Sequence, residues 1–268
     1  MSPRKLTLLL ALLLSALLLS AQTDSTKNGK IPSKYSVTEI YGLALSQYNG
    51  ASACFLPRSA VSAHFDNRFL VKEMMTKRVG AVFRKGQNSF LVDCQHFGYS
   101  RFGELTTRVG YGRRFGQHLA FALRFHYLMT HSTESACVHS ISFDLSGYAI
   151  IGKSIGLGFA VLNPARLKYG ITGKKVLPIR LQFDVNYKVG KQILLFARVE
   201  KELQSAFGIE AGATYQMKIL HLTVSAGFPS PCGTIRVQVA CGRWLIGVGG
   251  QYHLKAGFIP QAEVHCIF

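Results

Sequence analysis

The feature that most constrains the fold of this chain is an alternation of apolar and polar residues. Between Ile179 and Lys188 every odd position is apolar and every even position is polar or charged. Successive side chains of a β-strand point to opposite faces, whereas a helix would mix the two classes around its surface. This segment is therefore predicted to be a strand with one apolar face and one charged face.

The same period of two returns along most of the chain, for example from Gln117 to Met129. Such segments are predicted as strands over residues 59–69, 77–85, 88–97, 103–114, 117–129, 137–152, 154–163, 178–189, 191–201, 205–217, 219–228, 232–241, 243–254 and 258–268. Most reach the ~9 to 11 residues that a tilted strand needs to cross a bilayer, and their even number is typical of single-chain bacterial barrels. The predicted fold is all-β, a transmembrane antiparallel up-and-down barrel of about 14 strands.

The connections between these segments also tend to alternate in length. With both termini in the periplasm, the tight turns fall on one side of the barrel, at Gly86-Gln87, Phe115-Gly116, Lys153, Gly190, Lys218 and Gly242. The longer connections, residues 98–102, 130–136 and 164–177, fall on the other side. Short periplasmic turns and longer outer loops are typical of bacterial barrels. A soluble β-sandwich is the alternative, but its strands would have to bury a uniformly apolar face against itself.

The N-terminal residues are typical of an exported protein. Basic residues at Arg4 and Lys5 precede an apolar run, residues 6–19, that is shorter than the ~20 residues of a spanning helix. We expect a signal peptide over residues 1–21 and export to the cell outer membrane. Residues 22–58 contain a possible short helix at 36–45, and are expected either to plug the barrel or to form a periplasmic tail. Residues 59–268 are assigned to the barrel.

Charged residues on the polar face of the strands are predicted to point into the lumen. A Lys or Arg that faced lipid at mid-depth would cost ~2–4 kcal/mol. The residues assigned to the lumen on this ground are Arg124, His126, Arg180, Asp184, Lys188, Arg198, Glu200, Glu210, Arg236, Glu263 and His265. We expect them to form a structural network of ion pairs, with a lining for a water path as the alternative.

The charge balance of the chain indicates what it binds. The sequence has 31 Lys and Arg against 13 Asp and Glu, a formal net charge of +18. Most of these cations are scattered over turns and one strand face, so the clustered patch typical of a nucleic-acid-binding protein is missing and no nucleic-acid partner is expected. Attraction to anionic outer-membrane lipid and to the phosphates of lipopolysaccharide is expected instead.

The sequence contains no pattern that favours catalysis, a cofactor or a metal. Gly110-Tyr111-Gly112 and Gly156-Leu157-Gly158 lie within predicted strands, so they are interpreted as packing glycines and not as phosphate-binding loops. The six cysteines form no C-x-x-C pair and are expected to be free, with Cys232 and Cys241 the best candidates for a disulfide. We expect a non-enzymatic protein; a pair such as His131 with Ser132 at the rim is the weak alternative.

The last predicted strand alternates almost to the terminal residue, Phe268. This ending resembles the insertion signal of outer-membrane barrels, whose final aromatic residue is read by the barrel-assembly machinery. We therefore expect that machinery to be a partner and Phe268 to be its C-terminal assembly signal.

Over about residues 60–268 the order of elements resembles the PorV and PorQ type of outer-membrane barrel, relatives of the FadL long-chain fatty-acid transporters. The segments that carry the resemblance are Gly158–Pro164 ahead of a long loop, Leu177-Pro178 opening Ile179–Gly190, Leu195–Lys201, Gly208–Tyr215 and Ala226–Pro229. The chain departs from this family in being short, basic and rich in cysteine, and in lacking a recognisable FadL-like plug motif.

The resemblance implies one of two roles. PorV and PorQ proteins belong to the type IX secretion apparatus, so secretion-system proteins or cargo would be partners, whereas FadL relatives pass hydrophobic molecules. We expect an accessory or structural role in type IX secretion, with a FadL-like channel for hydrophobic small molecules as the alternative. A lumen closed by residues such as Arg124, Asp184, Arg198 and Glu210 would favour the first role, and a wide, wet lumen the second.

Overall fold

The computed structural model describes residues 35–268 except 134, 166–167, 170–174, 204–205, 230 and 255–256. The expected signal peptide and its cleavage site lie outside the described residues, as does part of the expected outer loop at 164–177. Among the described residues, no helix has both the length and the apolar character needed to span a bilayer.

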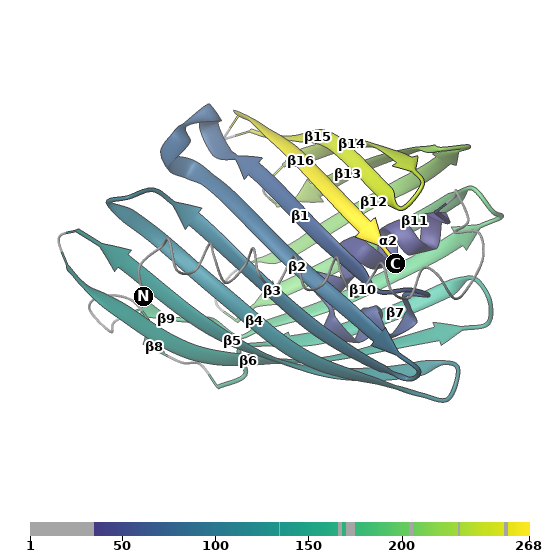
Figure 1. Cartoon of the computed structure of the whole chain (residues 1–268), viewed down its shortest axis with the longest axis horizontal. Helices are drawn as coiled ribbons and strands as arrows, with labels where there is room; N and C mark the ends of the chain where they lie inside the picture. Colours follow the sequence, from purple (N-terminus) through teal and green to yellow (C-terminus); the bar gives the residue numbers. More distant parts are fainter. Residues whose placement is uncertain are drawn as a thin grey trace.

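Fourteen strands of the described chain close into a single antiparallel barrel (Figure 1). They are β1 (Ala60–Asn67), β2 (Met75–Lys85), β3 (Asn88–Gly98), β4 (Phe102–Phe115), β5 (Leu119–Ser132), β6 (Ser135–Ile151), β7 (Ile155–Leu162), β10 (Arg180–Val189), β11 (Ile193–Glu202), β12 (Phe207–Met217), β13 (Leu220–Phe228), β14 (Cys232–Cys241), β15 (Trp244–His253) and β16 (Gly257–Ile267). Each strand pairs with its neighbour along the chain, and β1 pairs with β16 to close the seam. The predicted fold class and strand number are confirmed.

The main differences from the predicted segments lie at the outer connections, while bounds at the inner turns shift by one or two residues. The segment predicted at 59–69 ends at Asn67, because Phe69 and Leu70 take left-handed backbone angles (φ 60° and 55°) that a strand cannot contain. Two short 3-10 turns, η2 (Arg68–Leu70) and η3 (Lys72–Met74), follow instead. The expected loop after β7 contains a small separate hairpin, β8 (Lys168–Tyr169) with β9 (Lys175–Val176).

The two faces of the barrel differ in polarity as the alternation predicts. On β10, Phe183 and Val185 face outward and are about half exposed, while Gln182 and Asp184 face inward and are buried. The same arrangement on β5 exposes Phe125. A soluble sandwich would bury this apolar face, so the sandwich alternative is excluded by the closed sheet. The outward face instead suits contact with lipid.

Six tight turns lie at one end of the barrel, which we call the inner end, and each has one residue with positive φ. These residues are Gly86, Gly116, Gly152, Gly190, Gly242 and Lys218. Only glycine takes such angles without steric cost, so Lys218, at φ 47°, is the strained member of the set. The opposite end, where the longer connections lie, is the outer end.

The turns give a test of this backbone argument. An added Cβ at Gly86 would meet no atom within 4 Å, so the only strain that Gly86→Ala introduces is that of an alanine in a left-handed backbone conformation. We expect the substitution to lower the free energy of unfolding by about 1 kcal/mol. Lys218→Gly removes the same strain, so it should lower the free energy of unfolding by less than Gly86→Ala does, or raise it. Urea unfolding in phosphatidylcholine vesicles, followed by the fluorescence of the single tryptophan, Trp244, measures both. Equal losses in the two variants would contradict the argument.

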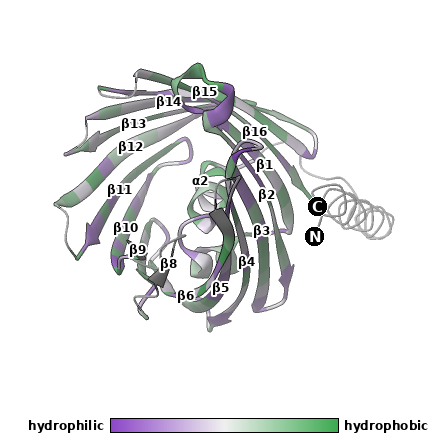
Figure 2. Ribbon diagram, turned by 90° about the vertical axis from the view of Figure 1, so that its left-hand side faces the viewer, coloured by the Kyte–Doolittle hydropathy of each residue, from purple (hydrophilic) through white to green (hydrophobic). Residues whose placement is uncertain are grey.

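The segment before β1 lies inside the barrel (Figure 2). It consists of α2 (Val37–Ser46) and the 3-10 helix η1 (Gly50–Phe55), and we call residues 35–56 the plug. Ser36 begins α2 with a capping box, in which its Oγ accepts from the Glu39 N–H and the Glu39 carboxylate accepts from the Ser36 N–H. Asn49 caps η1 by accepting from the Ala51 N–H at 3.0 Å.

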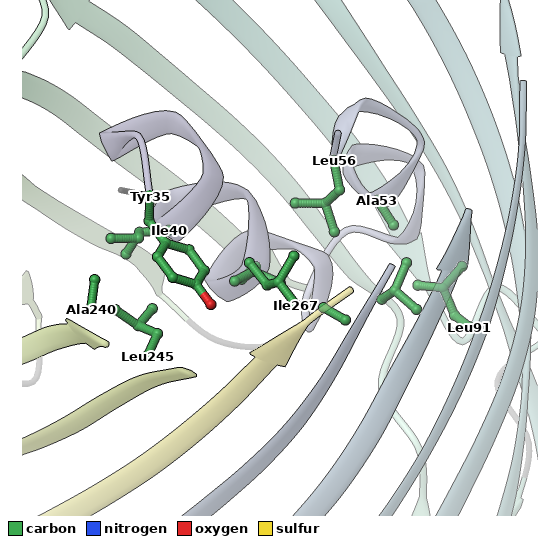
Figure 3. Packing of buried hydrophobic residues seen from close by; sticks show 11 residues of the cluster. Tyr35, Ile40, Ala53, Leu56, Leu91, Ala240, Leu245 and Ile267 are labelled. Carbon is green, nitrogen blue, oxygen red and sulfur yellow. The ribbon is translucent and has the colours of Figure 1, made fainter. Parts of the chain in front are cut away.

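Apolar side chains fix the plug against the inner half of the barrel wall. Tyr35, Ile40 and Leu56 pack against residues near the inner ends of the strands (Figure 3), and a second group packs against β5, β6 and β11. The wall residues in these two clusters are Ala60, Val82, Leu91, Ala120, Ala122, Tyr148, Leu194, Ala240, Leu245 and Ile267. They come from β1 to β3, β5, β6, β11 and β14 to β16, so the plug packs against wall strands on different sides of the lumen. Of the two locations left open for residues 22–58, the described part, 35–58, occupies the lumen.

Candidate functional site

The turn after α2, with Gln47 and Tyr48, is held by an arginine from the barrel wall. We call this turn the tip of the plug. Arg124 lies on the inward face of β5 and is 3% exposed. Its guanidinium donates to the carbonyls of Gln47 at 3.1 Å and Tyr48 at 2.7 Å, just past the C-terminus of α2, and to the carboxylate of Asp144 at 3.3 Å. A cation at this end of a helix satisfies carbonyls that have no partner within the helix and interacts favourably with its dipole. Arg124 therefore clamps the plug to the wall.

A second group from the neighbouring strands contacts the same turn of the plug. Arg78 on β2 donates to the side-chain oxygen of Gln47 at 3.0 Å and lies 3.4 Å from the carboxylate of Asp93 on β3. Arg108 on β4 contacts the other oxygen of Asp93 at 2.6 Å. The carboxylate thus holds two guanidinium groups in place, and one of them binds the plug.

A third group lies across the lumen on β10, β11 and β12. The Nε of Arg198 donates to Asp184 at 2.7 Å, and its Nη1 lies 3.6 Å from the carboxylate of Glu210. The same guanidinium sits 4.0 Å from the ring centroid of Tyr48, a cation–π contact with the plug. Three arginines, Arg78, Arg124 and Arg198, therefore hold the turn after α2 from different sides of the barrel.

A fourth group lies at the seam, away from the plug tip. Glu263 on β16 accepts from Gln238 at 2.7 Å and lies 3.3 Å from the Nε of Arg236. His265 contacts the other oxygen of Glu263 at 3.5 Å and pairs through its second ring nitrogen with the hydroxyl of Ser62 at 2.7 Å. This group bridges β14, β16 and β1, so it ties together the strands on both sides of the seam.

The structure places all eleven charged residues expected in the lumen on the inward face of their strands. Most of them come together in pairs or triads with opposite charge, including Arg180 with Glu200 at 3.1 Å and His126 with Asp144 at 2.6 Å. Lys188 stands apart and lines a cavity at the inner end. Phe268 follows β16 at the seam, where its N–H donates to the Ser59 carbonyl at 3.0 Å and its ring lies 6.5 Å from that of Phe83.

Sequence reasoning missed part of the network. Asp144 stood on the polar face of its predicted strand but was not among the expected lumen charges. Arg78 and Arg108 were missed because alternation is weak around them: the outward neighbours of Arg78 include Lys77, and those of Arg108 include Thr107. Asp93 has the outward neighbours Val92 and Cys94 and was missed as well. The register of β3 with β4, which pairs Asp93 directly with Arg108, is seen only in the structure.

Two cavities of about 500 Å³ each lie beside the plug. The outer cavity, of about 510 Å³, lies among β11 to β16 and reaches residues next to the outer loops, such as Glu202 and Pro229. The inner cavity, of about 490 Å³, lies against β6, β7, β10 and β11 and reaches Lys153 and Ser154 at an inner turn. Each has the volume of a typical small-molecule site.

One stretch of α2 separates these two cavities. Tyr41 and Leu45 line both of them, and the Tyr41 ring packs against Phe196 of β11 with the centroids 5.2 Å apart. We call Tyr41 and Leu45 the septum. Burial raises the pKa of Tyr41 well above its usual range, so the septum carries no charge at neutral pH.

Burial also keeps two further side chains of the plug, Tyr35 and Cys54, neutral. Burial raises the pKa of Tyr35 to about 12, and its hydroxyl donates to the carbonyl of Arg243. Burial likewise raises the pKa of the Cys54 thiol, which lies 3.0 Å from the Ser89 hydroxyl.

The six cysteines are free in the structure, Cys232 and Cys241 included. Across the residues that the structure describes, no group of three or more His, Cys, Asp or Glu side chains could hold a metal ion.

Comparison with known proteins finds similarity in fold and none in sequence. No protein-family model and no curated protein matches the sequence. A FadL homologue from Pseudomonas aeruginosa superposes with a TM-score of 0.61 over 83% of this chain and 93% of its own, at 7% identity. The toluene transporter TodX of Pseudomonas putida gives 0.56 over 84% and 92% at 9% identity, and Omp33 of Acinetobacter baumannii gives 0.54 over 79% and 98% at 9% identity. These likenesses show an outer-membrane barrel fold.

Proposed function

We propose that this protein passes small amphipathic molecules across the outer membrane, by a path that opens when the plug moves. The observation that carries the proposal is the pair of cavities that one helix separates, the outer one reaching the outer loops and the inner one an inner turn. A solute that displaced the septum would move from one cavity into the other without leaving the lumen. The barrel would sit in the outer membrane, exported by the signal peptide expected at residues 1–21 and inserted through recognition of Phe268.

The polar contacts at the tip of the plug are ones that water or a solute can replace. The tip is held by hydrogen bonds from Arg78 and Arg124 and by a cation–π contact from Arg198, which are individually exchangeable for contacts with water or solute. The septum contributes only two side chains, Tyr41 and Leu45, between cavities of similar volume. The two toluene transporters with the same fold, TodX and TbuX, have TM-scores of 0.56 and are consistent with an apolar component in the solute.

The proposal is tested by flux into phosphatidylcholine vesicles that contain the purified protein. Three solutes share a phenyl ring and cross lipid poorly: phenyltrimethylammonium, phenyl glucoside and benzenesulfonate. We expect at least one of them to enter faster than it enters protein-free vesicles, and faster than it enters vesicles with a boiled sample. Entry of sucrose should stay at the protein-free level, because sucrose has no apolar part that could displace the septum. If none of the phenyl solutes enters above background, the proposal fails.

A second candidate is the PorV/PorQ-like role in type IX protein secretion. The observation that favours it is the closure of the lumen by ion pairs that include Arg124, Asp184, Arg198 and Glu210, an arrangement that suits a scaffold. Its test is quantitative mass spectrometry of surface, culture-fluid and periplasmic proteins in a strain that lacks the gene, beside the wild type and a complemented strain. Accumulation of secreted cargo in the periplasm would support the secretion role, and an unchanged distribution would rule it out.

A further inference from the structure

The outer cavity has one apolar side and one polar side. The apolar side is formed by the plug and β11, with Ile40, Leu45 and Phe196. The opposite side is a wall of uncharged polar groups from β12 to β16, which consists of Thr214, Thr223, Ser225, Thr234, Gln238, Gln251 and Gln261. A ligand that fills this space would place an apolar part against the plug and a polar part toward the wall and the mouth.

The charged groups of the cavity are mostly acidic. Glu200, Glu202 and Glu210 line it, against Arg198 and Arg236. Both guanidiniums are already paired with carboxylates that are not among the lining residues of the cavity. Arg198 binds Asp184 at 2.7 Å, and Arg236 lies 3.3 Å from Glu263.

The three glutamates are only partly neutralised. Glu210 has a weaker second contact with Arg198, at 3.6 Å, and its side chain is 40% exposed. Glu200 pairs with Arg180 near the outer rim, where both side chains are well exposed. Glu202 takes part in no ion pair with any of the residues described. The cavity therefore has an excess of negative charge.

This excess stands out against the rest of the chain. The protein has a formal net charge of +18, yet no lysine among the described residues lines the outer cavity. The inner cavity differs in sign: Lys153 and Lys188 line it, and Glu39, its one carboxylate in the part of the chain that the structure describes, is paired with Arg58 at 3.0 Å. Low-dielectric walls focus the field of such groups into a cleft, so the outer cavity favours cations and disfavours anions.

We infer that the outer cavity binds an amphiphile with a positively charged ammonium or amine group, its apolar part against the septum and its cationic part between Glu202 and Glu210. The inference rests on the proposed function, because it names the class of solute that the outer cavity selects. The lysines of the inner cavity repel the same group, so the cation is retained on the outer side until the plug moves.

Binding measurements in nanodiscs of neutral phosphatidylcholine test the inference separately from flux. The probes are phenyltrimethylammonium, phenyl glucoside and benzenesulfonate, and the affinities are measured by isothermal titration calorimetry on the full mature chain. We expect the cation to bind at least about fivefold more tightly than the anion, since one charge about 4 Å away has this effect even in water-like surroundings. The neutral solute should fall between the two.

Two variants assign the preference to the carboxylates. Glu202→Gln should weaken binding of the cation, and Glu202→Gln/Glu210→Gln should remove most of the preference over the anion. The matched control is Glu73→Gln, an exposed glutamate of the outer connection that does not line the cavity. Tighter binding of benzenesulfonate, an unchanged preference in the double variant, or no binding of any probe would each overturn the inference. Solute flux without cation preference would leave the proposed function standing.

Discussion

Arg124→Met should lower the free energy of unfolding by about 3–5 kcal/mol, the largest effect expected of any single substitution in this barrel. The guanidinium is buried, and it is shared between the plug carbonyls of Gln47 and Tyr48 and the carboxylate of Asp144. The methionine fills similar space but donates no hydrogen bond. Its introduction leaves a buried carboxylate with His126 as its remaining ionic contact.

The measurement is urea unfolding in phosphatidylcholine vesicles with Trp244 as the reporter. Arg113→Met is the control, because Arg113 is an exposed arginine on the adjacent strand β4, and its replacement should change stability by no more than about 0.5 kcal/mol. The double variant Arg124→Met/Asp144→Leu removes both charges and should recover part of the loss. Equal stabilities of the wild type and Arg124→Met would show that the clamp contributes nothing to the folded state.

The fold could be predicted from the sequence because the lipid-facing and lumen-facing sides of a barrel strand require residues of different polarity. Most residues on the outward face of a strand must be apolar, as Phe183 and Val185 are, and the intervening residues face a polar lumen. The same parity placed Arg124, Asp184 and Glu263 inward. The lumen residues were therefore predictable one by one wherever the outward neighbours were apolar.

The partners of these residues were not predictable in the same way. Which carboxylate meets Arg124 depends on the register between β5 and β6, and alternation within one strand contains no information on the register with the next. The location of the plug was open for a similar reason. Residues such as Ile40 and Leu45 would be apolar both in a helix that fills a lumen and in a tail that packs elsewhere, and only the clusters with Val82 and Leu194 distinguish the two.

Fixing the plug to the wall should abolish solute flux, the second large effect that follows from this account. Gly50 of η1 and Ala122 of β5 face each other, and a Cβ built at Gly50 would lie 3.4 Å from the Ala122 Cβ, close to the separation found in disulfides. The nearest other atom, the Arg124 Cδ at 3.2 Å, belongs to a long side chain that can adjust. Gly50→Cys/Ala122→Cys in a background without the native cysteines thus provides a reducible tether.

The cysteine-free parent and the two single-cysteine variants are the matched controls. They should pass the phenyl solutes at the same rate with and without reductant, which separates the effect of the tether from that of the substitutions. Formation of the disulfide is verified by mass spectrometry of the oxidised sample, because a tether that does not form would mimic an insensitive path.

The most direct measurement is the entry of the three phenyl solutes into vesicles that contain the double-cysteine variant, first oxidised and then treated with dithiothreitol. If the path opens by movement of the plug, the oxidised protein passes no solute above the protein-free background and reduction restores the rate of the cysteine-free parent. If the oxidised and reduced proteins pass solute at equal rates, the plug does not gate the lumen and the proposed path is wrong.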